Sequence, residues 1–436
     1  MTMQPVHDVA QDGFYLGQRI GLLMHSLNPR GGVVHTLELA EALVQQGHRV
    51  TVLAAAQPGQ CLFRPTSALL SVAPMLLPLS MSPDPHAPSG LVTMVGTRIT
   101  AMAAHLRTLD LGAFDVLHSQ DGITANALAD LQDEGLIGGF VRTVHHLDVF
   151  DDAQMMAWQA RGVRQARTLL CVSAVWQDTL QRDWGRTAHR VTNGVDLQRF
   201  HNQPDVQDDA TLRQLGVQPD RPFWLAVGGV EGRKNTARLL AAFAQVMHES
   251  PTAQLVIVGG ASLLEHAEAQ REFEAVRQAH GLAPGQGHAH RLVLTGPVVD
   301  AELPALYRRA TALAMPSVKE GFGLVAIEAM ACGTPAIVSR IAPFTEHLQP
   351  HEAFWVDPFD VDSIAQALRN TLIAPVREAI AAPARSVAAR FDWQFSAQRH
   401  LAIYLGHVAT AASPDTAPTI TATTATATPP TLPCHA

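Results

Sequence analysis

Residues 317–339 have the sequence SVKEGFGLVAIEAMACGTPAIVS. They follow an apolar run, TALAMPS, that is typical of a strand. The helical stretch LVAIEAMA is ended by a Cys–Gly pair before the next strand, TPAIVS. This order predicts a strand, a turn, a helix and a second strand parallel to the first. The turn then lies at the carboxyl edge of an open α/β sheet, where ligands bind.

Two glutamates, Glu320 and Glu328, lie eight positions apart in this stretch, one before the helix and one inside it. Free amides and the dipole at the helix start favour an anion there, and Gly321 and Gly323 let a phosphate approach the backbone. Beside a phosphate, a carboxylate is useful where it accepts hydrogen bonds from hydroxyls of the same ligand. Two glutamates at this spacing are by themselves more often a cap and a solvent-exposed side chain; the flanking strand, glycines and helix favour ligand binding.

The same alternation of strands and helices fills most of the chain. A strand at 20–26, a turn with Gly31 and Gly32, a helix and a strand at 50–55 form a βαβ unit. Apolar runs thin out near residue 200, and a second series of strands begins with FWLAVGG. Since 436 residues exceed one ordinary core, two parallel-sheet α/β domains are expected.

Composition excludes several classes of protein. The formal charge of −8, without a dense Lys/Arg cluster, argues against nucleic acid as a partner. No apolar stretch is long enough for a transmembrane segment, and the N-terminus lacks the apolar core of a signal peptide. The four cysteines show no CxxC spacing, and Cys171 and Cys332 are expected to be buried free thiols, which fits a cytoplasmic location.

Several segments together resemble the family 4 glycosyltransferases, a large retaining group. Besides EGFGLVAIEAMACGTPAIVS, the similarity includes GGVVHTLELAEALVQQGHRVTVL, TVHH, VSA, NGVDLQRF, GRKNTARLLAAFA, LVIVGG and FDWQFSAQRH, over roughly residues 19–408. The resemblance implies a GT-B fold, with two doubly wound Rossmann-like domains facing a central cleft. The expected segments are an N-terminal extension (1–18), an acceptor-side domain (19–200), a nucleotide-sugar-binding domain (201–391), a helix packing back on the N-terminal domain (392–408) and a disordered Ala/Thr/Pro tail (409–436).

The resemblance also implies roles for individual residues. Glu320 contacts hydroxyls of the donor sugar, Glu328 binds the nucleotide ribose, and Lys234 neutralises the donor diphosphate. The backbone from Gly321 through Phe322 and Gly323 to Leu324 holds the distal phosphates. His145 lies near the donor sugar, so the expected catalytic residues are Glu320, His145 and Lys234.

The chain departs from the family at one phosphate-binding position. A family arginine often precedes the lysine in a Gly-Arg step, where this chain has Gly228 and Gly229; Arg233 is expected to replace it. As plain surface charges, Arg233 and Lys234 lie unfavourably at a helix start, which favours a bound anion. Gly31 and Gly32 match the family's phosphate or acceptor loop, although an ordinary βα turn explains them equally well.

Other patterns are weaker candidates for chemistry. In TVHHLD, His145 and His146 point to opposite sides of a strand, so they are not expected to share a metal ion. His118 fits a family H-x-H strand end whose second histidine is Gln120 here. DVDS at 360–363 is interpreted as a helix cap, not a metal-binding DxD. Neither a Walker motif nor G-x-G-x-x-G is present, and no metal or cofactor is expected.

The function that follows is retaining, metal-independent transfer of a sugar from a nucleotide-diphosphate sugar to a small-molecule or glycan acceptor. Two alternatives remain open: a nucleotide-sugar epimerase of the same fold, and a nucleotide-sugar-binding protein without turnover, which Gly229 in place of arginine keeps possible.

Overall fold

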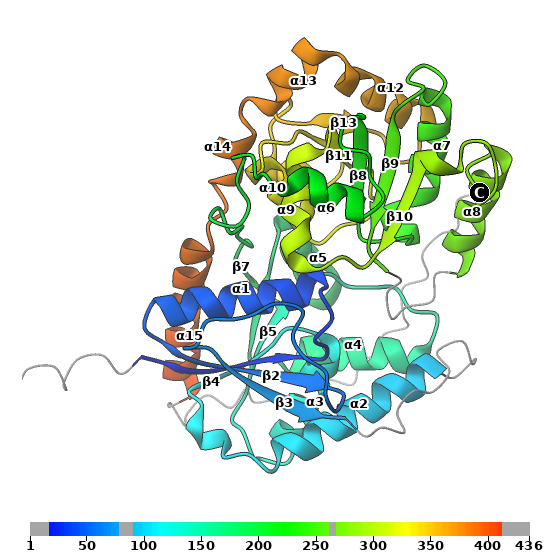
Figure 1. The fold of residues 1–436 in the computed structure, drawn as a ribbon. Coiled ribbons are helices and arrows are strands. Elements are labelled where there is room, and N and C mark those ends of the chain that lie inside the picture. Colours follow the sequence, from blue (N-terminus) through cyan, green and yellow to red (C-terminus); the bar gives the residue numbers. More distant parts are fainter. Residues whose placement is uncertain (1–16, 78–89, 261–266, 412–436) are drawn as a thin grey trace, which may run out of the picture.

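The computed structural model describes residues 17–77, 90–260 and 267–411, which form two α/β lobes (Figure 1). The predicted extension (1–18) lies outside the described residues except for residues 17 and 18. The predicted tail (409–436) also lies outside them, except for the end of the last helix at 409–411.

The N-terminal lobe is built on a seven-stranded sheet in the order β3-β2-β1-β4-β5-β6-β7, with parallel pairing throughout. On β1, Leu23 packs in one apolar cluster and Leu22 and Met24 in another, so both faces of the sheet are covered. The strands are β1 (Arg19–Met24), β2 (Arg49–Ala56), β3 (Ser71–Leu76), β4 (Val116–Ser119), β5 (Val141–Val144), β6 (Thr168–Cys171) and β7 (His189–Arg190). The helices are α1 (Gly31–Gln45), α2 (Gly90–Leu106), α3 (Gly122–Asp133), α4 (Ala153–Gln165) and α5 (Ala174–Trp184).

The C-terminal lobe contains a six-stranded parallel sheet in the order β10-β9-β8-β11-β12-β13. It too is covered on both faces, because Leu225 of β8 and its neighbour Trp224 belong to different clusters. The strands are β8 (Phe223–Val227), β9 (Gln254–Val258), β10 (Leu292–Gly296), β11 (Ala312–Met315), β12 (Ala336–Ser339) and β13 (Phe354–Val356). The helices are α6 (Asp208–Gln214), α7 (Thr236–Val246), α8 (Ala267–Ala279), α9 (Leu303–Arg309), α10 (Leu324–Ala331), α11 (Phe344–His347), α12 (Val361–Leu372), α13 (Ala374–Ala381) and α14 (Ala384–Ala388). The prediction of two parallel-sheet α/β units is confirmed.

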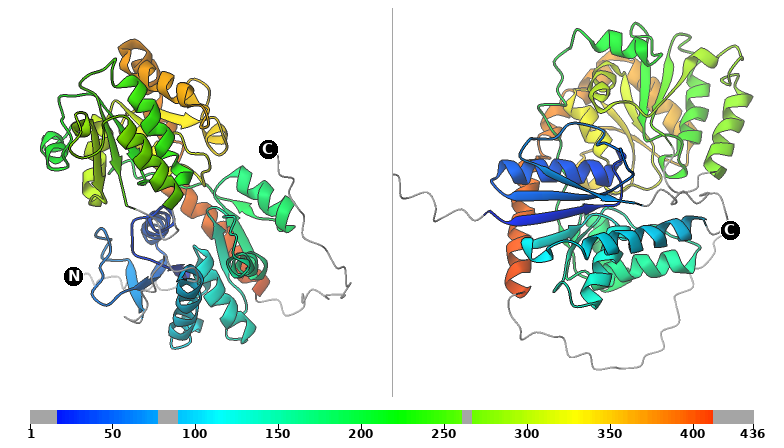
Figure 2. Two further views of the ribbon diagram at one scale, coloured as in Figure 1. Left: turned by 90° about the vertical axis from the view of Figure 1, so that its right-hand side faces the viewer. Right: turned by 60° about the horizontal axis from the view of Figure 1, so that its bottom comes forward.

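The chain crosses between the lobes twice, and the two crossing segments lie side by side. Val195 forms a parallel bridge with Asp392, and its N–H donates to the Phe391 carbonyl over 3.0 Å. A Cβ at Gly194 would lie only 2.3 Å from the Trp393 nitrogen, so this close approach requires glycine. After the second crossing, α15 (Trp393–Ala411) packs on α1 and β4 of the N-terminal lobe (Figure 2).

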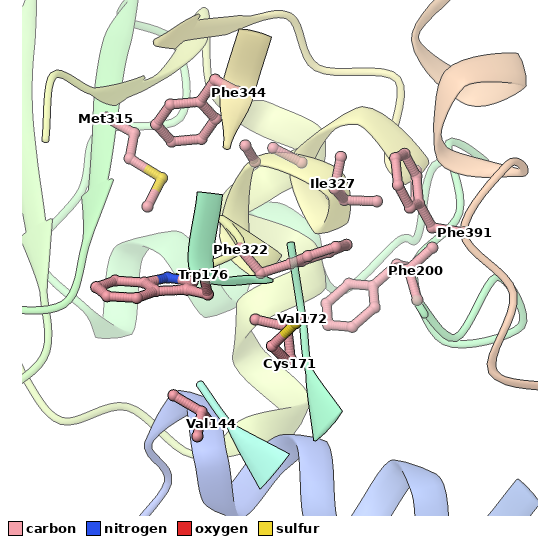
Figure 3. Close-up of a cluster of buried hydrophobic side chains, with 14 of the residues drawn as sticks. Val144, Cys171, Val172, Trp176, Phe200, Met315, Phe322, Ile327, Phe344 and Phe391 are labelled. Atoms are coloured by element: carbon pink, nitrogen blue, oxygen red, sulfur yellow. The ribbon is translucent and has the colours of Figure 1, made fainter. Parts of the chain in front are cut away.

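An apolar cluster joins the two lobes. Figure 3 shows side chains of both lobes in one buried cluster, among them Val144 and Trp176 of the N-terminal lobe and Phe322 and Ile327 of the C-terminal lobe. This packing brings the carboxyl ends of β5 and β6 against the turn between β11 and α10. No helix within the described ranges is long and apolar enough to cross a membrane.

Candidate active site

The turn between β11 and α10 is shaped by two glycines. Gly323 precedes α10 with φ of 93°, and a Cβ there would lie 2.6 Å from the Phe344 ring. A Cβ at Gly321 would lie 2.5 Å from the His145 carbonyl oxygen of the opposite lobe. In this structure, protein atoms therefore lie where side chains at these two positions would be. The lack of a side chain at Gly321 is what lets the two lobes come into contact here.

Glu320 lies at this turn between two cations. Its carboxylate accepts from Lys234 Nζ at 2.9 Å and from Arg233 Nη1 at 3.1 Å. Burial alone raises the pKa of Glu320, but the charges of Lys234 and Arg233 outweigh burial and lower this pKa to about 2. Burial also lowers the pKa of Lys234, against the opposing effect of Glu320. The structure thus brings three predicted site residues into one ion cluster.

The missing family arginine has a backbone cause. Gly229 has φ of 73°, and a Cβ there would lie 2.7 Å from the Gly260 carbonyl oxygen, so a larger residue requires the backbone to move. The neighbouring Gly228 makes room for the Lys234 stem, whose Cε lies 3.0 Å from the position of a Cβ at 228. Arg233, which bonds Glu320, also pairs with Glu231 at 3.4 Å.

A further arginine reaches this region from the N-terminal lobe. Burial lowers the pKa of Arg30, the charge of Glu231 opposes this effect and that of Arg233 adds to it, so the Arg30 guanidinium lies within electrostatic range of both residues. Arg30 is the residue before α1, and Gly31 and Gly32 are the first residues of that helix and not a separate turn. Arg30 was not among the residues predicted from the sequence, although its place directly before the glycine pair was a usable signal.

His145 follows β5 and is held inside the N-terminal lobe. Its Nε2 lies 3.2 Å from Gln120 Oε1, and its ring packs against His35 with centroids 4.6 Å apart. Burial, helped by the charge of His146, lowers the pKa of His145 to about 3, so the imidazole is neutral near pH 7. His146 is exposed and pairs instead with Asp148 at 3.2 Å. In the described part of the chain, no group of three or more His, Cys, Asp or Glu side chains is arranged to hold a metal ion.

Glu328 is buried on α10, with 8% of the residue exposed, and does not lie on a solvent-exposed helix face. The Tyr307 hydroxyl of α9 donates to Glu328 Oε2 over 2.7 Å. Burial raises the pKa of Glu328 to about 7, although Tyr307 and the charge of Arg199 lower it; the charges of Glu38 and Asp300 raise it further.

A second ion cluster surrounds this glutamate and spans both lobes. Arg199 pairs with Asp300 at 2.5 Å, and Arg64 pairs with Glu38 of α1 at 2.6 Å. The two pairs are linked, because Arg199 also lies 3.7 Å from Glu38. Neither this cluster nor Tyr307 could be predicted from local sequence patterns, because the interacting residues are far apart in the chain.

Two family models match consecutive parts of the chain. The model described as "Glycosyltransferase Family 4" matches residues 29–199, and that described as "Glycosyl transferases group 1" matches residues 207–386. Among curated relatives, a D-inositol 3-phosphate glycosyltransferase of Xylanimonas cellulosilytica is 28% identical, over 89% of this chain and 96% of its own. An uncharacterized glycosyltransferase of Methanocaldococcus jannaschii is 26% identical, over 81% and 89%.

Solved structures share the architecture. A sucrose-phosphate synthase of Thermosynechococcus elongatus superposes with a TM-score of 0.72 at 23% identity, covering 90% of this chain and all of the other. Anabaena HepE in complex with UDP-glucose superposes with a TM-score of 0.68 at 19% identity, covering 89% and all of the other chain. At these identities the likeness concerns the fold.

Proposed function

Because the chain belongs to the group 1 and family 4 glycosyltransferases and has the predicted GT-B fold, we propose that it transfers a sugar from a nucleotide-diphosphate sugar to an acceptor with retention and without a metal ion. The observation that carries this proposal is the ion cluster of Glu320, Lys234 and Arg233 at the start of α10, beside the backbone of His145.

The cluster has the charges that the reaction needs. Breaking the glycosidic bond leaves negative charge on the diphosphate, which Lys234, Arg233 and the free amides at the start of α10 stabilise electrostatically. Arg30 adds positive charge from the other lobe. These groups do the work that a divalent cation does in metal-dependent transferases, which supports metal independence.

Glu320 acts as a hydrogen-bond acceptor for the donor sugar hydroxyls. With a pKa of about 2 it is ionised at any physiological pH and has no proton to donate. Held by two cations, it is also a weak nucleophile, which favours attack by the acceptor on the face that the diphosphate leaves. Retention of configuration follows from this same-face attack.

His145 contributes as a neutral group. Its low pKa excludes a role as a general acid near pH 7 and fits a hydrogen-bonding contact to the donor sugar. The approach of its carbonyl to Gly321 is the kind of interlobe contact that excludes water from the reacting bond.

Less direct observations suggest which donor and acceptor to test first and where in the cell the protein is located. UDP-glucose is the first donor to test because HepE binds it, and an inositol phosphate is the first acceptor because the Xylanimonas relative carries that name. Cys171 and Cys332 are buried free cysteines, as predicted. This supports our proposal of a cytoplasmic location.

The test is a thermal-shift screen of UDP-, GDP- and ADP-sugars, followed by acceptor-dependent release of nucleotide in the presence of EDTA. A ligand at 100 times its dissociation constant adds about 2.7 kcal/mol of stability, so the true donor is easily recognised. We expect turnover in EDTA, and at least a hundredfold lower kcat for Glu320→Ala. Full activity of that variant, or turnover that EDTA abolishes and manganese restores, contradicts the proposal.

A further inference from the structure

Tyr307 makes hydrogen bonds to α10 and to the segment that follows it, one through its side chain and one through its backbone. Its side chain is fully buried and packs edge-on against Phe200, with ring centroids 5.8 Å apart. Its hydroxyl donates to Glu328 Oε2, while its carbonyl accepts from the Thr334 hydroxyl just before β12. The ring and backbone of α9 therefore hold the hydroxyl at a fixed place beside Glu328.

The hydrogen bond from Tyr307 occupies one oxygen of the Glu328 carboxylate and leaves the other available as an acceptor. No other described side chain is recorded as a hydrogen-bond donor to Glu328, so Oε1 remains as an acceptor. An ionised carboxylate accepts hydroxyl hydrogens at both oxygens, whereas a protonated one loses acceptor capacity. A donor fixed on Oε2 both orients Oε1 and favours the ionised form.

The groups around Glu328 disfavour its ionised form, so a donor that stabilises this form is needed. Glu328 lies near the anions Glu38 of α1 and Asp300 after β10, and near the cation Arg199 of the interlobe segment. Burial and the two anions disfavour a charged carboxylate at neutral pH, so the Tyr307 bond and Arg199 oppose two destabilising effects.

We propose that Tyr307 is a positioning residue of the nucleotide site, whose hydroxyl holds the Glu328 carboxylate so that Oε1 receives a ribose hydroxyl of the donor. This rests on the proposed function and on the role that the family resemblance implies for Glu328, which is to bind the donor ribose. Tyr307 itself does not touch the ligand.

The test is Tyr307→Phe, which removes the hydroxyl and keeps the ring. Its matched control is Tyr404→Phe, because Tyr404 is also fully buried and its hydroxyl also makes a 2.7 Å bond, to His118 in the other lobe. We expect Tyr307→Phe to raise the donor KM and the Kd of the nucleoside diphosphate about fivefold to tenfold, with kcat within about twofold. The Kd of the wild type should weaken as pH falls through 7, and in Tyr307→Phe this weakening should begin at higher pH.

Three outcomes separate failure of the inference from failure of the proposed function. If Glu328→Gln raises the donor KM but Tyr307→Phe changes neither KM nor the pH profile, the positioning role is wrong and the proposed function stands. An equal rise of KM in Tyr404→Phe also overturns the positioning role, because general loosening of packing then explains the effect. If Glu328→Gln leaves KM unchanged, the ribose does not bind there, and the assignment on which the inference rests fails with it.

Discussion

The smallest unit of the candidate site is one carboxylate shared by two cations. Lys234 and Arg233 both bond Glu320, and they are the same two cations that the proposed function assigns to the diphosphate. Removing one member of a buried ion cluster leaves the others uncompensated, which costs more than the net value of the pair. Binding of a nucleoside diphosphate and ion pairing with Glu320 therefore compete for the same two cations.

This competition gives a prediction of opposite sign for binding and catalysis. Glu320→Gln should bind a nucleoside diphosphate about threefold to tenfold more tightly than the wild type, because the cations then serve the diphosphate alone, while kcat falls. Isothermal titration and steady-state kinetics measure the two effects. Lys234→Gln is the control, and should weaken binding at least tenfold. Weaker binding by Glu320→Gln would show that the carboxylate organises the cations and does not compete for them.

For helices and strands, the local sequence pattern predicted many of the elements, but it did not predict how distant elements pack together. The strand expected at 50–55 is β2 (Arg49–Ala56), and the helix expected after Gly31 and Gly32 is α1. β3 was not predicted from the sequence; it contains Pro74, a residue that interrupts an apolar strand pattern but is tolerated at the edge of a sheet, where β3 lies. Glu320 and Lys234 were identified by the family motif, whereas Tyr307 and Arg30 act through partners that only the fold brings near.

The packing of α15 on the N-terminal sheet is an example of such contacts between residues far apart in the chain. His400 of α15 stacks near His35 and His118, and Tyr404 bonds His118 across 286 residues of sequence. Burial lowers the pKa of His35 and His118 well below 6.5, and that of His400 to about 4. The helix is thus held by a core of neutral imidazoles.

This core predicts that acid weakens the fold. Unfolded histidines take up protons below about pH 6.5, whereas His400 stays neutral down to about pH 4 and His35 and His118 stay neutral well below pH 6.5. Stability is therefore full above about pH 6.5 and falls as pH drops. Each histidine contributes up to about 1.4 kcal/mol per pH unit over this window. Urea unfolding between pH 7.5 and 5 measures the slope, and His400→Leu should reduce it by about one proton. The exposed His189 of β7 provides the control, His189→Leu. An unchanged slope in His400→Leu would contradict a neutral His400.

Between the two lobes, some contacts complete an element of one lobe with a group from the other. The start of α5 in the N-terminal lobe has no cap from its own Ser173, whose hydroxyl donates instead to the Gly321 carbonyl of the other lobe. Glu346 of α11 supplies the cap, accepting from the Ala174 and Val175 amides at 2.6 and 2.8 Å. A helix of one lobe is thus completed by a carboxylate of the other, directly beside the turn that carries Glu320.

Loss of this cap should therefore weaken donor binding as well as stability. A missing N-cap costs about 1 kcal/mol. If the cap forms only when the lobes are together, Glu346→Ala shifts the population towards separated lobes and weakens donor binding by up to about fivefold. The control is Asp152→Ala, since Asp152 caps α4 through two amides within one lobe. It should lower the melting temperature similarly and leave donor affinity unchanged. Small-angle scattering should show a larger radius of gyration for ligand-free Glu346→Ala alone. If Glu346→Ala and Asp152→Ala behave alike in both measurements, the Glu346 cap persists when the lobes separate, and closure must depend on the contacts of Gly321 and the ion cluster around Arg199.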